Sequence, residues 1–142
     1  MPHTTEIPVT WGDTDAGGLI YFPRFFHYAV VGLNDYFAPA VETGHLMEAL
    51  RTEGLVLPAV DASASFESPL RAGETARLRT TVRALGTSSL TTAFEVERAA
   101  DGERAARVTV TFVLVDEQFE STALPQAIRD CVAARGDDPD AD

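Results

Sequence analysis

The chain is predicted to be an α+β domain in which one antiparallel sheet wraps a buried helix. Three observations lead to this prediction. Apolar side chains cover about half the girth of a helix expected at residues 23–38, which is typical of a helix nearly surrounded by protein. Four long β-like segments follow one another between residues 55 and 116. No internal repeat or interior linker interrupts the 142 residues, a length that suits one domain.

The first strand is expected at residues 6–11, where a weak alternation ends at Trp11. Pro8 suits a strand start or a sheet edge better than the middle of a sheet. Gly17 and Gly18 then form a tight turn into the long helix.

Pro23 begins the long helix, because its missing N–H costs nothing at the first helical position, and Pro39 ends it. Two adjoining apolar stripes run along this helix: Phe26, Val30, Leu33 and Phe37, and beside them Phe25, Ala29, Gly32 and Tyr36. A shorter helix is expected at residues 44–52, with Thr43 as its N-cap.

The remaining strands are expected at residues 55–67, 75–85, 90–98 and 104–116. In the last hairpin, a three-residue loop at residues 100–102 pairs Phe94 with Val108 and keeps the apolar side chains on one face. The same loop places Gly102 where a positive φ is needed. Pro125 begins a last helix that buries Ile128 and Val132.

Composition excludes several classes of protein. The net charge of −11 argues against nucleic acid or an anionic membrane as partner. All 11 basic residues are arginine, so any basic contact with a phosphate must come from arginine. The lone Cys131 cannot form an internal disulfide, and no spacing suits a metal site. Without a long apolar run or a signal-peptide pattern, the expected location is the cytoplasm. Residues 136–142 form an acidic tail that is expected to be disordered, which leaves residues 1–135 as the single domain.

Residues 11–28 carry the strongest chemical signal. A carboxylate, Asp15, lies just ahead of the glycine turn and of the helix that begins at Pro23. The free amides of a helix N-terminus attract developing negative charge, and an acid beside such an oxyanion site can attack an activated carbonyl. The alternative is that Asp15 is only a turn residue or side-chain cap. Asp13 is interpreted as structural.

The run from Asp13 to Pro23, followed by an aromatic-rich helix, resembles the signature of the hotdog-fold acyl-CoA thioesterases, and most closely their 4-hydroxybenzoyl-CoA thioesterase branch. Residues 57–74 resemble that family's long second strand and turn, and residues 111–116 a later strand; the similarity covers residues 5–135. This resemblance implies a hotdog fold, with a five-stranded antiparallel sheet around a long central helix.

The resemblance also implies roles. Asp15 would attack the thioester carbonyl or activate a water, and the backbone amide of Phe22 would bind the oxyanion. Gly17 and Gly18 let the backbone present that amide. Tyr21 and the Phe22 side chain would contact the acyl group or a partner subunit. Some relatives have histidine in place of Phe22, and the phenylalanine here favours the aryl-CoA branch; His27 is interpreted as a surface or interface residue.

Other candidates concern the rest of the substrate. Arg77, Arg79 and Arg83 share one strand face, either a solvated outer surface or a dock for the phosphates of coenzyme A. Ser63 and Ser65 either line a pocket or are small residues where two sheets meet.

The function predicted from these features is hydrolysis of an acyl-CoA thioester, with an aromatic acyl group, to free acid and coenzyme A. No metal or organic cofactor is expected, and the resemblance implies a homodimer or homotetramer with active sites across the subunit boundary. Two alternatives stay open: a thioesterase for aliphatic acyl-CoA or acyl carrier protein, and a hotdog protein that binds an acyl thioester without turnover.

Overall fold

The computed structural model describes residues 3–139 and contains one five-stranded antiparallel sheet with the strand order β1-β3-β4-β5-β2. The strands are β1 (His3–Pro8), β2 (Ala59–Phe66), β3 (Thr75–Leu85), β4 (Ser89–Arg98) and β5 (Arg104–Val113). The edge strands are β1 and β2, which are the first two in the chain. The predicted α+β class and hotdog architecture are confirmed.

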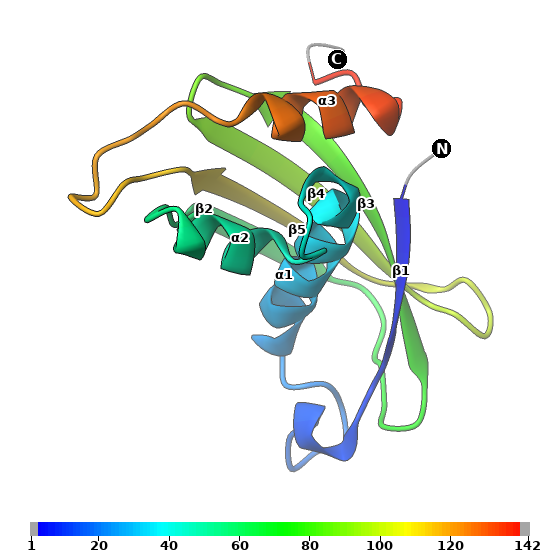
Figure 1. Ribbon diagram of the computed structural model, residues 1–142. Helices are drawn as coiled ribbons and strands as arrows, with labels where there is room; N and C mark the ends of the chain where they lie inside the picture. The colour runs from blue at the N-terminus through cyan, green and yellow to red at the C-terminus, as the bar shows by residue number, and fades with distance from the viewer. Residues whose placement is uncertain (1–2, 140–142) are drawn as a thin grey trace.

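The helices are α1 (Arg24–Phe37), α2 (Leu46–Thr52) and α3 (Gln126–Ala134), with short 3-10 turns η1 (Trp11–Asp13) and η2 (Ala38–Ala40). Figure 1 shows α1 lying across one face of the sheet, with α3 beyond its C-terminal end and the η1 loop beyond its N-terminal end. Helix α1 packs against β1, β3, β4 and β5, so the core lies between this helix and the sheet.

The buried face of α1 contains all of the second predicted stripe and the C-terminal half of the first, Leu33 and Phe37. Its buried residues are Phe25, Tyr28, Ala29, Gly32, Leu33, Tyr36 and Phe37, whereas Phe26 and Val30 are half-buried. Gly32 allows the close approach: a Cβ there would lie 3.1–3.2 Å from side-chain atoms of Leu78, Thr80 and Phe94.

The register of the β4–β5 hairpin is as predicted, and the loop is not. Phe94 pairs with Val108. The Arg98 N–H donates to the Glu103 carbonyl at 2.8 Å, so the loop has four residues, 99–102, rather than three. A bulge at Ala105 absorbs the extra residue and buries two successive alanines. Gly102 has the expected positive φ of 74°.

Two other local predictions were wrong because a side chain closed a turn. Strand β1 ends at Pro8, and Trp11 lies exposed in η1, because the Asp13 carboxylate accepts hydrogen bonds from the Thr10 N–H and hydroxyl. At α2 the N-cap is His45 rather than Thr43, since His45 Nδ1 accepts the Glu48 N–H at 3.2 Å.

The C-terminal segment closes the far end of the molecule. Helix α3 buries Ile128 and Val132 as predicted, and Cys131 is a buried thiol whose pKa is raised by that burial. Of the expected acidic tail, residues 136–139 are described and 140–142 lie outside the described residues. Asp137 is held in place, because its Oδ2 accepts the Tyr36 hydroxyl at 2.6 Å and the Val82 N–H at 2.9 Å.

Candidate active site

The loop between η1 and α1 forms a small antiparallel hairpin, residues 13–21, which we call the Asp15 hairpin. Its rungs are the Asp15 N–H to the Leu19 carbonyl and the Tyr21 N–H to the Asp13 carbonyl, both at 2.8 Å. At the turn, Gly18 adopts a φ of 81°, a conformation that glycine takes without strain. The hairpin therefore carries Asp15 at its turn and delivers the chain to Phe22, just ahead of α1.

The Asp15 carboxylate is exposed in the single chain. Its Oδ1 accepts the Gly17 N–H at 2.8 Å, as an aspartate in a turn commonly does. Within residues 3–139 no basic side chain pairs with it, and Oδ2 accepts no hydrogen bond. A carboxylate with a free oxygen is available as a nucleophile or base, while the contact with Gly17 is also what the turn-residue alternative predicts.

The backbone N–H of Phe22 is a free donor at the start of α1. Among the described residues it has no hydrogen-bond acceptor, whereas its neighbours Tyr21 and Arg24 both donate, to the carbonyls of Asp13 and Tyr21. Free amides at a helix N-terminus carry partial positive charge and bind anions or oxyanions. Asp15 and this donor thus lie at the turn and at the end of the same short hairpin.

An open apolar cavity of about 450 Å³ lies beside this region. It is lined by Leu19, Ile20, Phe22, Phe25, Phe66, Glu67, Ser68, Pro69 and Leu70. The Phe66 ring lies 6.0 Å from the ring of Phe22 and 5.4 Å from that of Phe25, so three aromatic side chains form one wall. Phe22 and Phe66 are 57% and 49% exposed, which leaves this wall accessible to a flat apolar group.

Asp13 is buried among donors and has a structural environment, as interpreted from the sequence. Its Oδ2 accepts the Tyr28 hydroxyl at 2.8 Å together with both donors of Thr10, and Arg24 Nε lies 3.8 Å from Oδ1. Burial raises the pKa of Asp13, but the hydrogen bonds from Thr10 and Tyr28 and the charge of Arg24 outweigh it, so the pKa is lowered. Burial and the adjacent Asp13 raise the pKa of Tyr28, which keeps it a neutral donor.

The three candidate arginines lie apart from the Asp15 hairpin. On β3 they alternate with buried Leu78, Thr80 and Val82, so they project from the sheet face opposite α1. Arg77 and Arg79 both contact Glu97 Oε1, at 3.3 and 3.2 Å, whereas Arg83 is exposed at a bulge of β3. Coenzyme A would have to compete with Glu97 for the first two.

Ser63 and Ser65 lie exposed on β2 and do not line the aromatic cavity of the single chain. They lie opposite Thr109 and Arg107 of β5, on the other face of β2 from the cavity residue Phe66. Tyr21 is exposed, with its ring 5.7 Å from that of Phe22, and His27 is exposed on α1.

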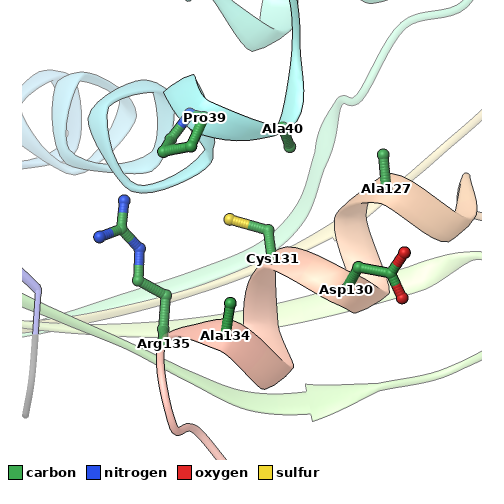
Figure 2. Close-up of a pocket in the computed structure, with 7 residues that line it drawn as sticks. All are labelled: Pro39, Ala40, Ala127, Asp130, Cys131, Ala134 and Arg135. Atoms are coloured by element: carbon green, nitrogen blue, oxygen red, sulfur yellow. The ribbon is translucent and has the colours of Figure 1, made fainter.

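A second open cavity, of about 520 Å³, lies between η2 and α3 (Figure 2). Cys131 and Arg135 project from α3 toward α1 and η2 there, and Arg135 donates to the Tyr36 carbonyl at 2.8 Å. None of the residues 13–23, which carry the thioesterase-like signature, lines this cavity. In the described part of the chain, no group of three His, Cys, Asp or Glu residues could hold a metal ion, and no helix is long and apolar enough to cross a membrane.

Sequence analysis missed Phe66 and the turn that follows it, residues 67–70. The signal was present in part: Phe66 ends a strand on the same side as Ala64, which packs against the core. Its contact with the start of α1 depends on the tertiary fold, so no local spacing pointed to it.

Comparison with known proteins gives the family of the chain. The family model described as the Thioesterase-like superfamily matches residues 9–132. The chain is 27% identical over 126 residues to the Bacillus subtilis (strain 168) protein YneP, whose name describes a candidate acyl-CoA thioesterase, with 88% of each chain covered.

Solved structures show the same fold. A 1,4-dihydroxy-2-naphthoyl-CoA thioesterase from Synechocystis superposes with a TM-score of 0.83 at 21% identity, covering 92% of this chain and 94% of that one. A gentisyl-coenzyme A thioesterase gives 0.80 at 21% identity, covering 92% and 99%. A Staphylococcus aureus protein solved in complex with CoA gives 0.82 at 14% identity, covering 95% and 84%.

The fold and the family match together define a thioester hydrolase with a hotdog fold. The chain belongs to the Thioesterase-like superfamily.

Proposed function

We propose that this protein hydrolyses an aromatic acyl-CoA thioester to the free acid and coenzyme A, with Asp15 as the reacting carboxylate and the Phe22 N–H as the oxyanion donor. One observation carries the proposal: a carboxylate with a free oxygen and an unpaired amide lie on one hairpin, beside an aromatic cavity. The flat aryl groups in the names of two structural neighbours are in keeping with an aromatic acyl group.

Two chemical routes use these groups. In one, a carboxylate oxygen of Asp15 bonds to the thioester carbon, the C–S bond breaks, and water then hydrolyses the resulting anhydride. In the other, Asp15 takes a proton from a water whose oxygen attacks the same carbon. In both, the leaving thiolate takes a proton to give free coenzyme A, and the carbonyl oxygen carries negative charge in the transition state, which the Phe22 N–H stabilises.

The proposal includes a homodimer or homotetramer. Strand β2 is a sheet edge with both faces largely exposed, and it carries the exposed apolar residues Val60 and Phe66. A second chain covering this edge would reduce the exposure of the aromatic cavity. The proposal also keeps a cytoplasmic location, and the net charge of −11 supports the absence of a nucleic-acid partner.

One observation favours the non-catalytic alternative, a protein that binds an acyl thioester without turnover: in the single chain Asp15 is exposed and engaged with the Gly17 N–H. The aliphatic acyl-CoA and acyl-carrier-protein alternatives depend instead on how the cavity is filled. Thiol release from a panel of benzoyl-, hydroxybenzoyl- and fatty acyl-CoA substrates, with acyl carrier protein thioesters, distinguishes all three.

Asp15→Asn tests the catalytic role. We expect thiol release to fall by about 1,000-fold or more, because the amide is neither a nucleophile nor a base. Binding of coenzyme A, measured by calorimetry, should be retained. Wild-type protein that binds acyl-CoA but releases no thiol would overturn the proposal in favour of the binding function.

A further inference from the structure

We propose that Asp13 and Tyr28 form a positioning pair for the reaction, in which the Tyr28 hydroxyl locks the Asp15 hairpin onto the first turns of α1. This inference rests on the proposed function and concerns how the two reacting groups are held relative to one another. The bond between Tyr28 and Asp13 Oδ2 is 2.8 Å long, and the Tyr28 side chain is almost fully buried.

Asp13 connects three segments that would otherwise be independent. Its carboxylate accepts from Thr10 at the end of the first strand segment and from Tyr28 on α1. Its backbone carbonyl accepts the N–H of Tyr21, the rung that closes the Asp15 hairpin. One residue thus fixes the base of the hairpin to the strand side and to the helix side at once.

The position of this pair matters for the chemistry. Asp15 follows Asp13 by two residues, and Phe22 follows Tyr21, so each proposed reacting group is within two residues of the same rung. Helix α1 is fixed by the core, and the Tyr28 ring contacts Phe25 of the cavity wall at 6.3 Å. Without the pair, the hairpin could tilt on α1 and change the separation between the Asp15 carboxylate and the Phe22 N–H.

The protonation states of Asp13 and Tyr28 favour a hydrogen bond that persists at neutral pH. The pKa of Asp13 is lowered and that of Tyr28 is raised, so at neutral pH an ionised acceptor meets a neutral donor. Hydrogen bonds to an ionised group are shorter and stronger than neutral ones. Arg24, at 3.8 Å, offsets the charge of Asp13 near a site where negative charge develops.

Helix α1 supplies a matched control. Tyr36 is equally buried, lies two turns further along α1, and donates to Asp137 Oδ2 at 2.6 Å, at the end away from the hairpin. Tyr28→Phe and Tyr36→Phe therefore each remove one buried tyrosine–carboxylate bond from the same helix. Only the first removes a bond to the Asp15 hairpin.

The experiment measures kcat and KM for thiol release, with thermal unfolding as a parallel measurement. We expect Tyr28→Phe to lower kcat by about ten- to a hundredfold with KM changed less than about threefold, because misplaced reacting groups affect the transition state more than binding. Tyr36→Phe should lower the melting temperature to a similar extent and leave kcat unchanged. Asp13→Asn, which keeps an oxygen acceptor for Tyr28, should retain more activity than Asp13→Ala. Asp13→Ala should lower kcat by a smaller factor in a Tyr28→Phe background than in wild type, because the Tyr28 bond is already lost there and the contacts with Thr10 are not.

The outcomes separate this inference from the function on which it rests. If Asp15→Asn abolishes turnover while Tyr28→Phe and Tyr36→Phe leave kcat alike, the pair is only structural and the inference is overturned. If Asp15→Asn keeps full activity, the proposed function fails, and the pair loses its role as well, whatever Tyr28→Phe does.

Discussion

The ring of Phe66, at the end of β2, lies 6.0 Å from the ring of Phe22, at the entry to α1. Strand β2 leads into the turn at residues 67–70 that lines the cavity, and Phe22 carries the amide proposed as the oxyanion donor. The contact between the two rings therefore connects the cavity turn to the proposed oxyanion site. The two rings meet nearly edge to face, at an interplanar angle of 69°, and the Phe66 ring also lies 5.4 Å from the ring of Phe25. The aromatic wall is therefore built by distant parts of the chain.

If this wall binds the acyl group, Phe66→Ala should lower kcat/KM for benzoyl-CoA by about fivefold, since one aromatic contact contributes about 1 kcal/mol. The effect on hexanoyl-CoA should be smaller, because an aliphatic chain has no ring to stack. Phe119→Ala is the control, because Phe119 is 75% exposed and lines no cavity. Equal losses for both substrates would contradict an aromatic subsite at Phe66.

The oxyanion role of Phe22 belongs to its backbone, so it can be separated from its ring. Phe22→Ala keeps the N–H and removes the ring, whereas Phe22→Pro removes both. We expect kcat for Phe22→Pro to fall about 100- to 1,000-fold below that of Phe22→Ala, the usual cost of one oxyanion donor. Circular dichroism and thermal unfolding check that both variants fold. Equal kcat values in two folded variants would rule out this amide as the donor.

Much of the fold could be predicted from the pattern of apolar and polar residues in the sequence. Strand β3 was predicted to the residue, Thr75–Leu85, because buried side chains alternate regularly with less buried ones from Thr75 to Val82. Strand β1 was misplaced because His3, Thr4 and Thr5 are polar and pair with β3 without an apolar signal. The bulge at Ala105 escaped prediction because alanine fits either face of a strand.

The sequence predicted only those parts of the candidate site whose residues are close together along the chain. Asp15, the glycine turn and Phe22 are close in sequence, and the structure places them on one hairpin. Phe66 and the Tyr28–Asp13 bond depend on how distant elements pack, which periodicity does not encode. Strand parity predicted that Arg77 and Arg79 share one face, but their shared partner Glu97 comes from the register with β4.

A pH dependence follows from Asp35 on the exposed side of α1. Burial raises its pKa, but hydrogen bonds from Thr5 and His3 outweigh this, so the folded-state pKa lies below the usual value of an aspartate, 3.8. A lowered folded pKa means that the carboxylate stabilises the fold above its unfolded pKa and that this contribution is lost as the pH falls through the folded value.

The measurement is urea unfolding of wild type and Asp35→Asn between pH 2.5 and 7. The difference in unfolding free energy should be constant above about pH 5 and shrink toward lower pH. A difference that grows on acidification would mean that the pKa of Asp35 is raised, contrary to its hydrogen bonds.

The core contains one polar group whose removal should stabilise the protein. Thr80 on β3 is fully buried, and its Oγ1 has no hydrogen-bond partner among residues 3–139. Thr92 on neighbouring β4 is equally buried, but its hydroxyl donates to the Val110 carbonyl at 3.2 Å. Valine has nearly the shape of threonine, so each Thr→Val substitution replaces a hydroxyl by a methyl group with little change in packing.

We expect Thr80→Val to raise the unfolding free energy by about 1 kcal/mol, because an unpaired buried hydroxyl carries a desolvation cost that a methyl group does not. Thr92→Val should not stabilise, since it removes a hydrogen bond that offsets that cost and leaves the Val110 carbonyl with one bond fewer. Chemical denaturation of the two variants beside wild type gives both values. A Thr80→Val variant that is less stable than wild type would show that the Thr80 hydroxyl has a hydrogen-bond partner in solution.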